Sequence, residues 1–204
     1  MTGPLAILIG PMAAGKTSVG RALASRLDVP FADLDALIVE ADGRSIPEIF
    51  AADGETAFRE IEAATLSRAL VEHPGVLSLG GGAPLHPASR ELLRGAPVIF
   101  LDIDESIAAR RLMHGAGRPM LQGTDPMARW RELATEREPR YRELAALRID
   151  SGHGSPSRVA RAILATLQLD PSTPSHSPAP PNDSAPSNSS APSHSAAPSK
   201  KEPS

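Results

Sequence analysis

GPMAAGKT, residues 10–17, has the form G-x-x-x-x-G-K-[ST]. A short apolar run, residues 5–9, precedes it, and apolar residues at helical spacing, between Val19 and Leu27, follow it. A glycine-rich loop between a buried strand and a helix binds phosphate, because its backbone N–H groups and the helix N-terminus point at the phosphate oxygens. The segment therefore predicts an α/β protein that binds a nucleotide.

The residues of this loop have separate expected roles. Lys16 is expected to reach the β- and γ-phosphates, and the Thr17 hydroxyl is expected to ligate Mg²⁺. Lys16 is also the only lysine before residue 200, although the chain holds 21 lysines and arginines. Ala13 stands where many such loops have glycine, so we expect the backbone to pass that point without a positive φ. The residues expected to contact the nucleotide from this segment are Ala13, Ala14, Gly15, Lys16, Thr17 and Ser18.

Outside the loop, strand and helix patterns alternate along the chain. Short segments rich in apolar residues predict strands at residues 5–9, 30–34, 76–79, 98–101 and 147–149. Helical spacing predicts further helices at about residues 35–41, 46–52, 55–71, 87–94, 105–113, 125–145 and 156–168. This alternation predicts a parallel sheet with helices on both faces, and ligands bind such sheets at the carboxyl ends of the strands.

The composition divides the chain into a globular domain at residues 1–170 and a tail at residues 171–204. Proline and serine supply 20 of the 34 residues of that tail. A segment of this kind lacks the apolar content to offset its ordering entropy, so we expect it to be disordered.

The composition also argues against several functions. With no Cys, the chain cannot use disulfides, thiol nucleophiles or Cys-based zinc sites, and its six His are too scattered for a metal site. A net charge of −3 and 3% aromatic residues argue against nucleic-acid binding. No apolar run approaches the roughly 20 residues of a membrane span, and the first residues lack the basic segment of a signal peptide. We therefore expect a cytoplasmic protein without membrane contact.

Acidic, glycine-rich and arginine-rich clusters follow the predicted strands. Asp33 and Asp35 end the second strand and, as alternating residues of an extended segment, are expected to face the phosphate site together. One is expected to hold Mg²⁺ and the other to take a proton from an acceptor hydroxyl. Taken alone, such a pair is also typical of a helix N-cap. The triplet Gly80-Gly81-Gly82 would let a ligand approach the backbone closely.

Arginines complete the set. Arg59 and Glu62 are i, i+3 neighbours on one helix face, so the glutamate is expected to orient the guanidinium for a ligand carboxylate. An exposed surface ion pair is the alternative. Arg110, Arg111 and Arg118 flank a Gly-rich loop at about 114–124, which suggests a lid that closes over phosphate. Trp130 and Tyr141 are expected to be packing residues of the long helix.

In their order and spacing these segments resemble the shikimate kinase family over about residues 5–168. The resemblance rests on GPMAAGKT, DLD at 33–35, FREIE at 58–62, LGGG at 79–82, RPML at 118–121 and REPRY at 137–141. It implies ATP-dependent phosphorylation of the 3-hydroxyl of shikimate, in aromatic amino-acid biosynthesis. It also implies a P-loop kinase fold like that of the nucleoside monophosphate kinases, with a five-stranded parallel sheet in the order 2-3-1-4-5, and a monomer.

The resemblance further assigns roles to individual residues. It makes Lys16, Asp35 and Arg118 the catalytic residues, with Asp35 as the base. Nucleotide contacts beyond the phosphate loop come from Arg111, Arg118 and Pro156, and Mg²⁺ is held by Thr17 and Asp33. The residues assigned to shikimate are Asp35, Arg59, Gly80, Gly81, Gly82 and Arg137.

Two alternatives remain at this stage. Another small-molecule kinase, of the gluconate or nucleoside monophosphate type, would share the phosphate loop but would not be expected to combine FRxxE, GGG and RxxxY. A non-catalytic nucleotide-binding module would be expected to have lost Lys16, Asp35 or Arg118, and all three are present.

Overall fold

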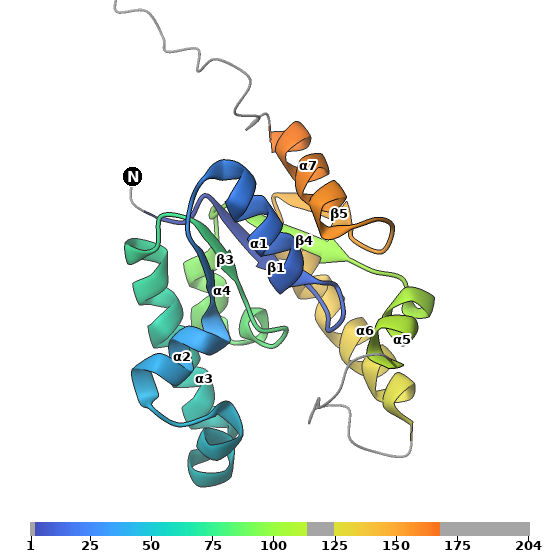
Figure 1. Ribbon diagram of the computed structural model, residues 1–204. Coiled ribbons are helices and arrows are strands. Elements are labelled where there is room, and N and C mark those ends of the chain that lie inside the picture. Colours follow the sequence, from blue (N-terminus) through green and yellow to red (C-terminus); the bar gives the residue numbers. More distant parts are fainter. Residues whose placement is uncertain (1–2, 114–124, 168–204) are drawn as a thin grey trace, which may run out of the picture. The chain divides into compact units, whose positions relative to one another are not determined.

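The computed structural model describes residues 3–113 and 125–167 of the chain (Figure 1). Its strands are β1 (Ala6–Ile9), β2 (Phe31–Asp33), β3 (Val76–Ser78), β4 (Val98–Asp102) and β5 (Leu147–Asp150). They form one parallel sheet in the order β2-β3-β1-β4-β5. The predicted fold class and strand order are therefore confirmed.

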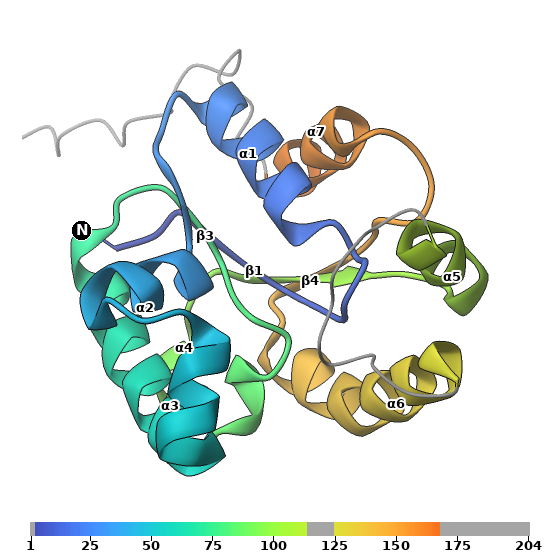
Figure 2. The same ribbon diagram turned by 60° about the horizontal axis from the view of Figure 1, so that its bottom comes forward.

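The helices cover both faces of this sheet. They are α1 (Lys16–Leu27), α2 (Leu34–Asp42), α3 (Ile46–Glu72), α4 (Pro87–Leu93), α5 (Glu105–Met113), α6 (Pro126–Leu144) and α7 (Pro156–Leu167), with a short 3₁₀ turn, η1, at Ala83–Leu85. Figure 2 shows α1 and α7 together on one face, and α3, α4 and α6 on the other. No helix among the described residues is long and apolar enough to cross a membrane.

The central strand β1 shows why its sequence is apolar throughout. Ala6 and Leu8 belong to the hydrophobic cluster under α1 and α7, whereas Ile7 and Ile9 belong to the cluster under α3 and α6. All four side chains are at most 1% exposed. Because successive side chains of a strand point to opposite faces, a strand covered on both sides needs apolar residues at every position.

Local signals set the limits of α3. At its start, the Ser45 hydroxyl accepts from the backbone N–H of Glu48, and the Glu48 carboxylate accepts from the N–H of Ser45, which is a capping box. Gly54 interrupts the helix with φ 79° and ψ 178°, between the two helices expected at 46–52 and 55–71. This interruption separates the residues of the first turns from the segment that carries Arg59 and Glu62.

The topology brings three loops to one edge of the sheet. The phosphate loop follows β1, the Asp33–Asp35 segment follows β2 and the glycine triplet follows β3, and these three strands are neighbours. Parallel strands have their carboxyl ends at the same edge, so the loops meet there. The predicted lid with Arg118 and the predicted tail at 171–204 lie outside the described residues.

Candidate active site

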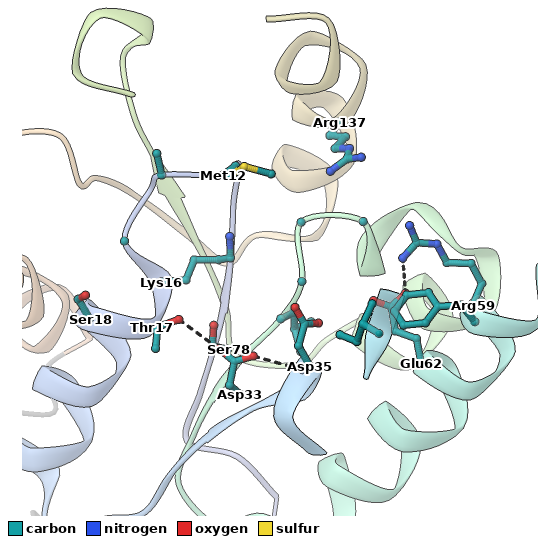
Figure 3. Close-up of a pocket in the computed structure, with 18 of the residues that line it drawn as sticks. Met12, Lys16, Thr17, Ser18, Asp33, Asp35, Arg59, Glu62, Ser78 and Arg137 are labelled. Carbon is teal, nitrogen blue, oxygen red and sulfur yellow. Dashed lines mark hydrogen bonds and ion pairs between the residues drawn. The ribbon is translucent and has the colours of Figure 1, made fainter. Parts of the chain in front are cut away.

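A cavity of about 550 Å³ opens at this edge of the sheet, within the range typical of ligand pockets (Figure 3). Its walls come from the phosphate loop, the β2–α2 junction, the glycine triplet, α3 and α6. The residues singled out from the sequence that line it are Ala13, Gly15, Lys16, Thr17, Ser18, Asp33, Asp35, Arg59, Glu62, Gly80, Gly81, Gly82, Arg111 and Arg137.

The side chain of Lys16 bonds back to the backbone of the phosphate loop. Lys16 Nζ donates to the carbonyl oxygens of Gly10 at 2.8 Å and Pro11 at 3.1 Å. Gly15, the N-cap of α1, has a left-handed backbone with φ 83°. Gly15 and the first residues of α1, Lys16–Ser18, line the cavity, which suits phosphate binding at a helix N-terminus.

Ala13 departs from expectation. The expectation that the loop passes this residue without a positive φ is wrong, because Ala13 has φ 69°. Two left-handed residues, Ala13 and Gly15, flank Ala14, and alternating backbone handedness of this kind turns successive N–H groups into one concavity. For a residue with a Cβ this conformation costs about 1–2 kcal/mol, so the surrounding contacts must hold it.

Thr17 and Asp33 are in direct contact. The Thr17 hydroxyl donates to Asp33 Oδ2 at 3.1 Å (Figure 3), and both groups border the cavity. Asp33 is also the N-cap of α2, because its Oδ1 accepts from the backbone N–H of Asp35 at 3.2 Å. The cap interpretation and the ligand interpretation of this aspartate are thus compatible.

Asp35 faces the cavity for a reason different from the one expected. It lies in the first turn of α2 and not on an extended strand, so alternation along a strand does not align it with Asp33. The helix start turns both carboxylates to the cavity instead. Burial raises the pKa of Asp35 above its ordinary value of 3.8, and the charge of Asp33 raises it further, whereas Lys16 and Arg59 oppose the rise.

The glycine triplet lies against three charged side chains. A Cβ on Gly80 would lie 2.9 Å from Asp35 Oδ1, one on Gly81 would lie 3.3 Å from Arg137 Nη1, and one on Gly82 would lie 2.5 Å from Arg59 Nη2. Any larger residue at position 80 or 82 would displace the neighbouring charge. Glycine is needed here for close approach, and the same three contacts gather Asp35, Arg59 and Arg137 around one backbone segment.

Arg59 is held by a buried carboxylate. Its Nη1 donates to Glu62 Oε2 at 2.6 Å, and the Glu62 side chain is only 2% exposed. Burial raises the pKa of Glu62, and the Arg59 guanidinium opposes that rise. The pair is therefore not the exposed surface contact that was the alternative. Arg59 lines the cavity, and its Nη2 also contacts Glu55 at 3.3 Å.

A smaller cavity of about 200 Å³ adjoins the phosphate loop, and Ala14, Ser18, Arg111 and Pro156 are among its lining residues. Arg111 Nη1 donates to the Ala13 carbonyl at 2.9 Å, and Nη2 donates to the Ser151 carbonyl at 2.8 Å. The guanidinium edge thus joins the phosphate loop to the loop before α7. Arg111 and Pro156, which the family resemblance assigns to the nucleotide, line the same space.

Two polar contacts were not predicted from the sequence. Trp130 and Tyr141 are buried as expected of packing residues, yet each also donates a hydrogen bond to a site loop. Trp130 Nε1 donates to the Met12 carbonyl at 3.0 Å, and the Tyr141 hydroxyl donates to the Gly81 carbonyl at 2.6 Å. The available signal was chemical, since a buried indole or phenol needs an acceptor.

Comparisons with known proteins agree with this geometry. The shikimate kinase family model matches residues 12–168. A shikimate kinase from Rhodococcus jostii (strain RHA1) is 43% identical over 164 residues, which cover 80% of this chain and 98% of that protein.

Solved structures of shikimate kinases are also similar to this chain. The shikimate kinase from Acinetobacter baumannii in complex with shikimate superimposes with a TM-score of 0.76 at 34% identity, over 84% of this chain and 96% of that one. A gluconokinase from Sinorhizobium meliloti 1021 covers a similar share, 83% of this chain and 94% of its own, with a lower TM-score of 0.58 and 25% identity. With its strand order, its phosphate loop and a family match over most of its length, this chain belongs to the shikimate kinase family.

Proposed function

We propose that this chain transfers the γ-phosphoryl group of ATP to the 3-hydroxyl of shikimate. The observation that carries the proposal is the convergence of Asp35, Arg59 and Arg137 on the glycine triplet, in the same cavity as the phosphate loop. An acceptor with one carboxylate and several hydroxyls matches this set, because arginines bind carboxylates and aspartate binds hydroxyls.

The acceptor is positioned by the two arginines. Arg59, fixed by Glu62, and Arg137, on α6, would bind the carboxylate of shikimate. This leaves the hydroxyl-bearing side of the ring toward Asp35. Positioning of this kind supplies much of the rate in phosphoryl transfer, where the protein does little covalent chemistry.

Asp35 would act as the base. Its carboxylate accepts the proton of the attacking hydroxyl, and its raised pKa makes it a better proton acceptor than an ordinary aspartate. Lys16 would leave the carbonyls of Gly10 and Pro11 and bind the β- and γ-phosphates. Arg118 would add positive charge from the lid.

The residues at the β2–α2 junction fit Mg²⁺. A hydroxyl and a carboxylate oxygen 3.1 Å apart at the cavity edge, on Thr17 and Asp33, match an ion that takes few protein ligands and keeps its other positions for water and phosphate. When bound, the ion would neutralise charge on the phosphates. We also propose a monomer, since one chain supplies every group named, and a cytoplasmic location, where ATP is available.

The proposal is tested by ADP release in a coupled assay with ATP, Mg²⁺ and shikimate, with gluconate and AMP as parallel acceptors. Shikimate-dependent release that is lost in Lys16→Ala is the expected result. Release with gluconate alone would assign the gluconate-type activity that the weaker structural likeness allows. ATP binding without release for any acceptor would favour the non-catalytic module.

A further inference from the structure

Helix α6 contacts both substrate loops through hydrogen bonds from buried side chains. Near its start, Trp130 donates to the carbonyl of Met12 in the phosphate loop at 3.0 Å. Three turns later, Tyr141 donates to the carbonyl of Gly81 in the glycine triplet at 2.6 Å. Figure 2 shows α6 on the same face of the sheet as α3 and α4.

The two donors share a helix face with a substrate-binding candidate. Trp130, Arg137 and Tyr141 are spaced by seven and four residues, which returns each side chain to nearly the same direction at 3.6 residues per turn. Arg137 lines the cavity between them. The helix face that reaches for the acceptor is thus also the face that is bonded to both loops.

Both hydrogen-bond donors, Trp130 and Tyr141, are buried. Trp130 is 5% exposed and Tyr141 is 0% exposed, so a donor that lost its acceptor would be left buried and unsatisfied, which is costly. Burial raises the pKa of Tyr141 to about 12, so the phenol keeps its proton and remains a donor. The rings lie in different hydrophobic clusters, Trp130 with α1 and α7 and Tyr141 with α3, so each bond is set by its own surroundings.

A further cavity lies beside the same helix. A second cavity of about 390 Å³ lies between α6 and the end of β4, and Pro11, Trp130 and Tyr141 all border it. The loops themselves meet nearby, since a Cβ on Gly81 would lie 3.5 Å from the carbonyl oxygen of Gly10. The two hydrogen bonds therefore join α6 to the loops at the border of this cavity.

We propose that Trp130 and Tyr141 are positioning residues which fix the nucleotide loop and the acceptor loop to one helix. Trp130 holds the Met12–Ala13 turn, where the left-handed Ala13 needs support, and so governs nucleotide affinity. Tyr141 orients the Gly81 peptide beside Arg137, and so governs acceptor affinity. This inference rests on the proposed function for its choice of acceptor.

The test is a crossed comparison of two variants of the full-length enzyme. Trp130→Phe is expected to raise the KM for ATP about three- to tenfold and leave the KM for shikimate within about twofold. Tyr141→Phe, which removes one oxygen atom, is expected to do the reverse. Leu133→Ala, at a buried apolar position of the same helix, is the matched control. It should lower Tm and leave both KM values unchanged.

A second form of the test avoids the cavity that the smaller phenyl ring of Trp130→Phe would leave. Trp130 is the only tryptophan of the chain, so growth on benzothienylalanine replaces the indole N–H by sulfur at this one site. The same rise in the KM for ATP is expected there. Variants that change both KM values in equal proportion, or change only Tm, would overturn the inference.

Failure of the proposed function would be visible separately. Wild-type protein without shikimate-dependent turnover would reject the acceptor, whereas calorimetric binding of ADP would still test Trp130. A Trp130→Phe protein that is folded and binds ADP as tightly as the wild type would reject the positioning role on its own.

Discussion

Asp35 is a carboxylate whose negative charge the fold disfavours. Burial is the largest cause, and the charge of Asp33 adds to it, so the pKa is raised above 3.8. A group with a raised pKa in the folded state gives its stabilisation below its ordinary pKa and loses it as the pH rises through the folded value. At neutral pH the ionised Asp35 therefore destabilises the protein relative to a neutral side chain.

Asp35→Asn is expected to be more stable than the wild type at pH 7, with Tm higher by about 1–4 °C. The difference should shrink toward pH 4, where more of the wild-type carboxyl is protonated. Activity should fall by about 10²–10⁴, because the proton acceptor is lost. Calorimetry at both pH values together with the coupled assay measures this. A variant less stable than the wild type at pH 7 would show that Lys16 and Arg59 outweigh the burial.

Glu62 offers a second test at the residue scale. Glu62→Gln removes the charged acceptor that fixes Arg59 at 2.6 Å, so the KM for shikimate should rise about tenfold or more, with little change for ATP. Glu55→Gln is the matched control, since Glu55 contacts the same guanidinium at 3.3 Å but its side chain is 70% exposed. Exposed pairs contribute about 0–1 kcal/mol. Equal effects of the two substitutions would contradict the role of burial.

At the scale of elements, the glycine triplet acts through its closeness to Arg59. Gly82→Ala would place a Cβ 2.5 Å from Arg59 Nη2, so the guanidinium must move and the KM for shikimate should rise about tenfold. In an Arg59→Ala background the same substitution meets no guanidinium, and the further change should be less than about twofold. Steady-state kinetics of the four proteins forms the cycle. If the effects of the two substitutions on KM are additive, the rise caused by Gly82→Ala comes from the backbone of residues 80–82 and not from the contact with Arg59.

The limits of sequence reasoning are clearest in single elements. The strands β1 and β4 followed from short apolar runs because burial on both faces demands them, whereas β2 and β5 are less buried and carry charged residues. Helix α2 begins within one residue of the helix expected at 35–41. The extended conformation expected at Asp35 is wrong, because the residues of Asp33-Leu34-Asp35 suit a strand end and a helix N-cap equally well. The positive φ of Ala13 was missed because propensity argues against it, and only the loop as a whole requires it.

For the whole molecule, the site residues could be gathered from the sequence because parallel topology puts every strand end at one edge. The structure brings Lys16, Asp35, Arg59 and Arg137 to one cavity. The contacts of Trp130 and Tyr141 could not be found in this way. They join residues 118 and 60 positions apart, and neither partner is marked by its residue type, since each acceptor is a backbone carbonyl.

The tail remains a prediction at this scale, and deletion of residues 171–204 tests it. The family match ends at residue 168, and within the domain Arg26 on α1 donates to the Ser157 hydroxyl on α7 at 2.8 Å. We expect kcat to be unchanged and Tm to move by less than about 2 °C. Thermal unfolding and kinetics of both lengths measure this. A large fall in Tm would show that the tail stabilises the domain.

The bond between Trp130 and Met12 also makes the molecule its own optical sensor. As the sole indole of the chain, Trp130 is the one residue that selective excitation reaches, and its emission depends on the hydrogen bond and the burial of its ring. Nucleotide entering the phosphate loop should change its emission without any attached dye. Competing compounds can then be ranked by fluorescence in the intact enzyme, even where they block turnover completely.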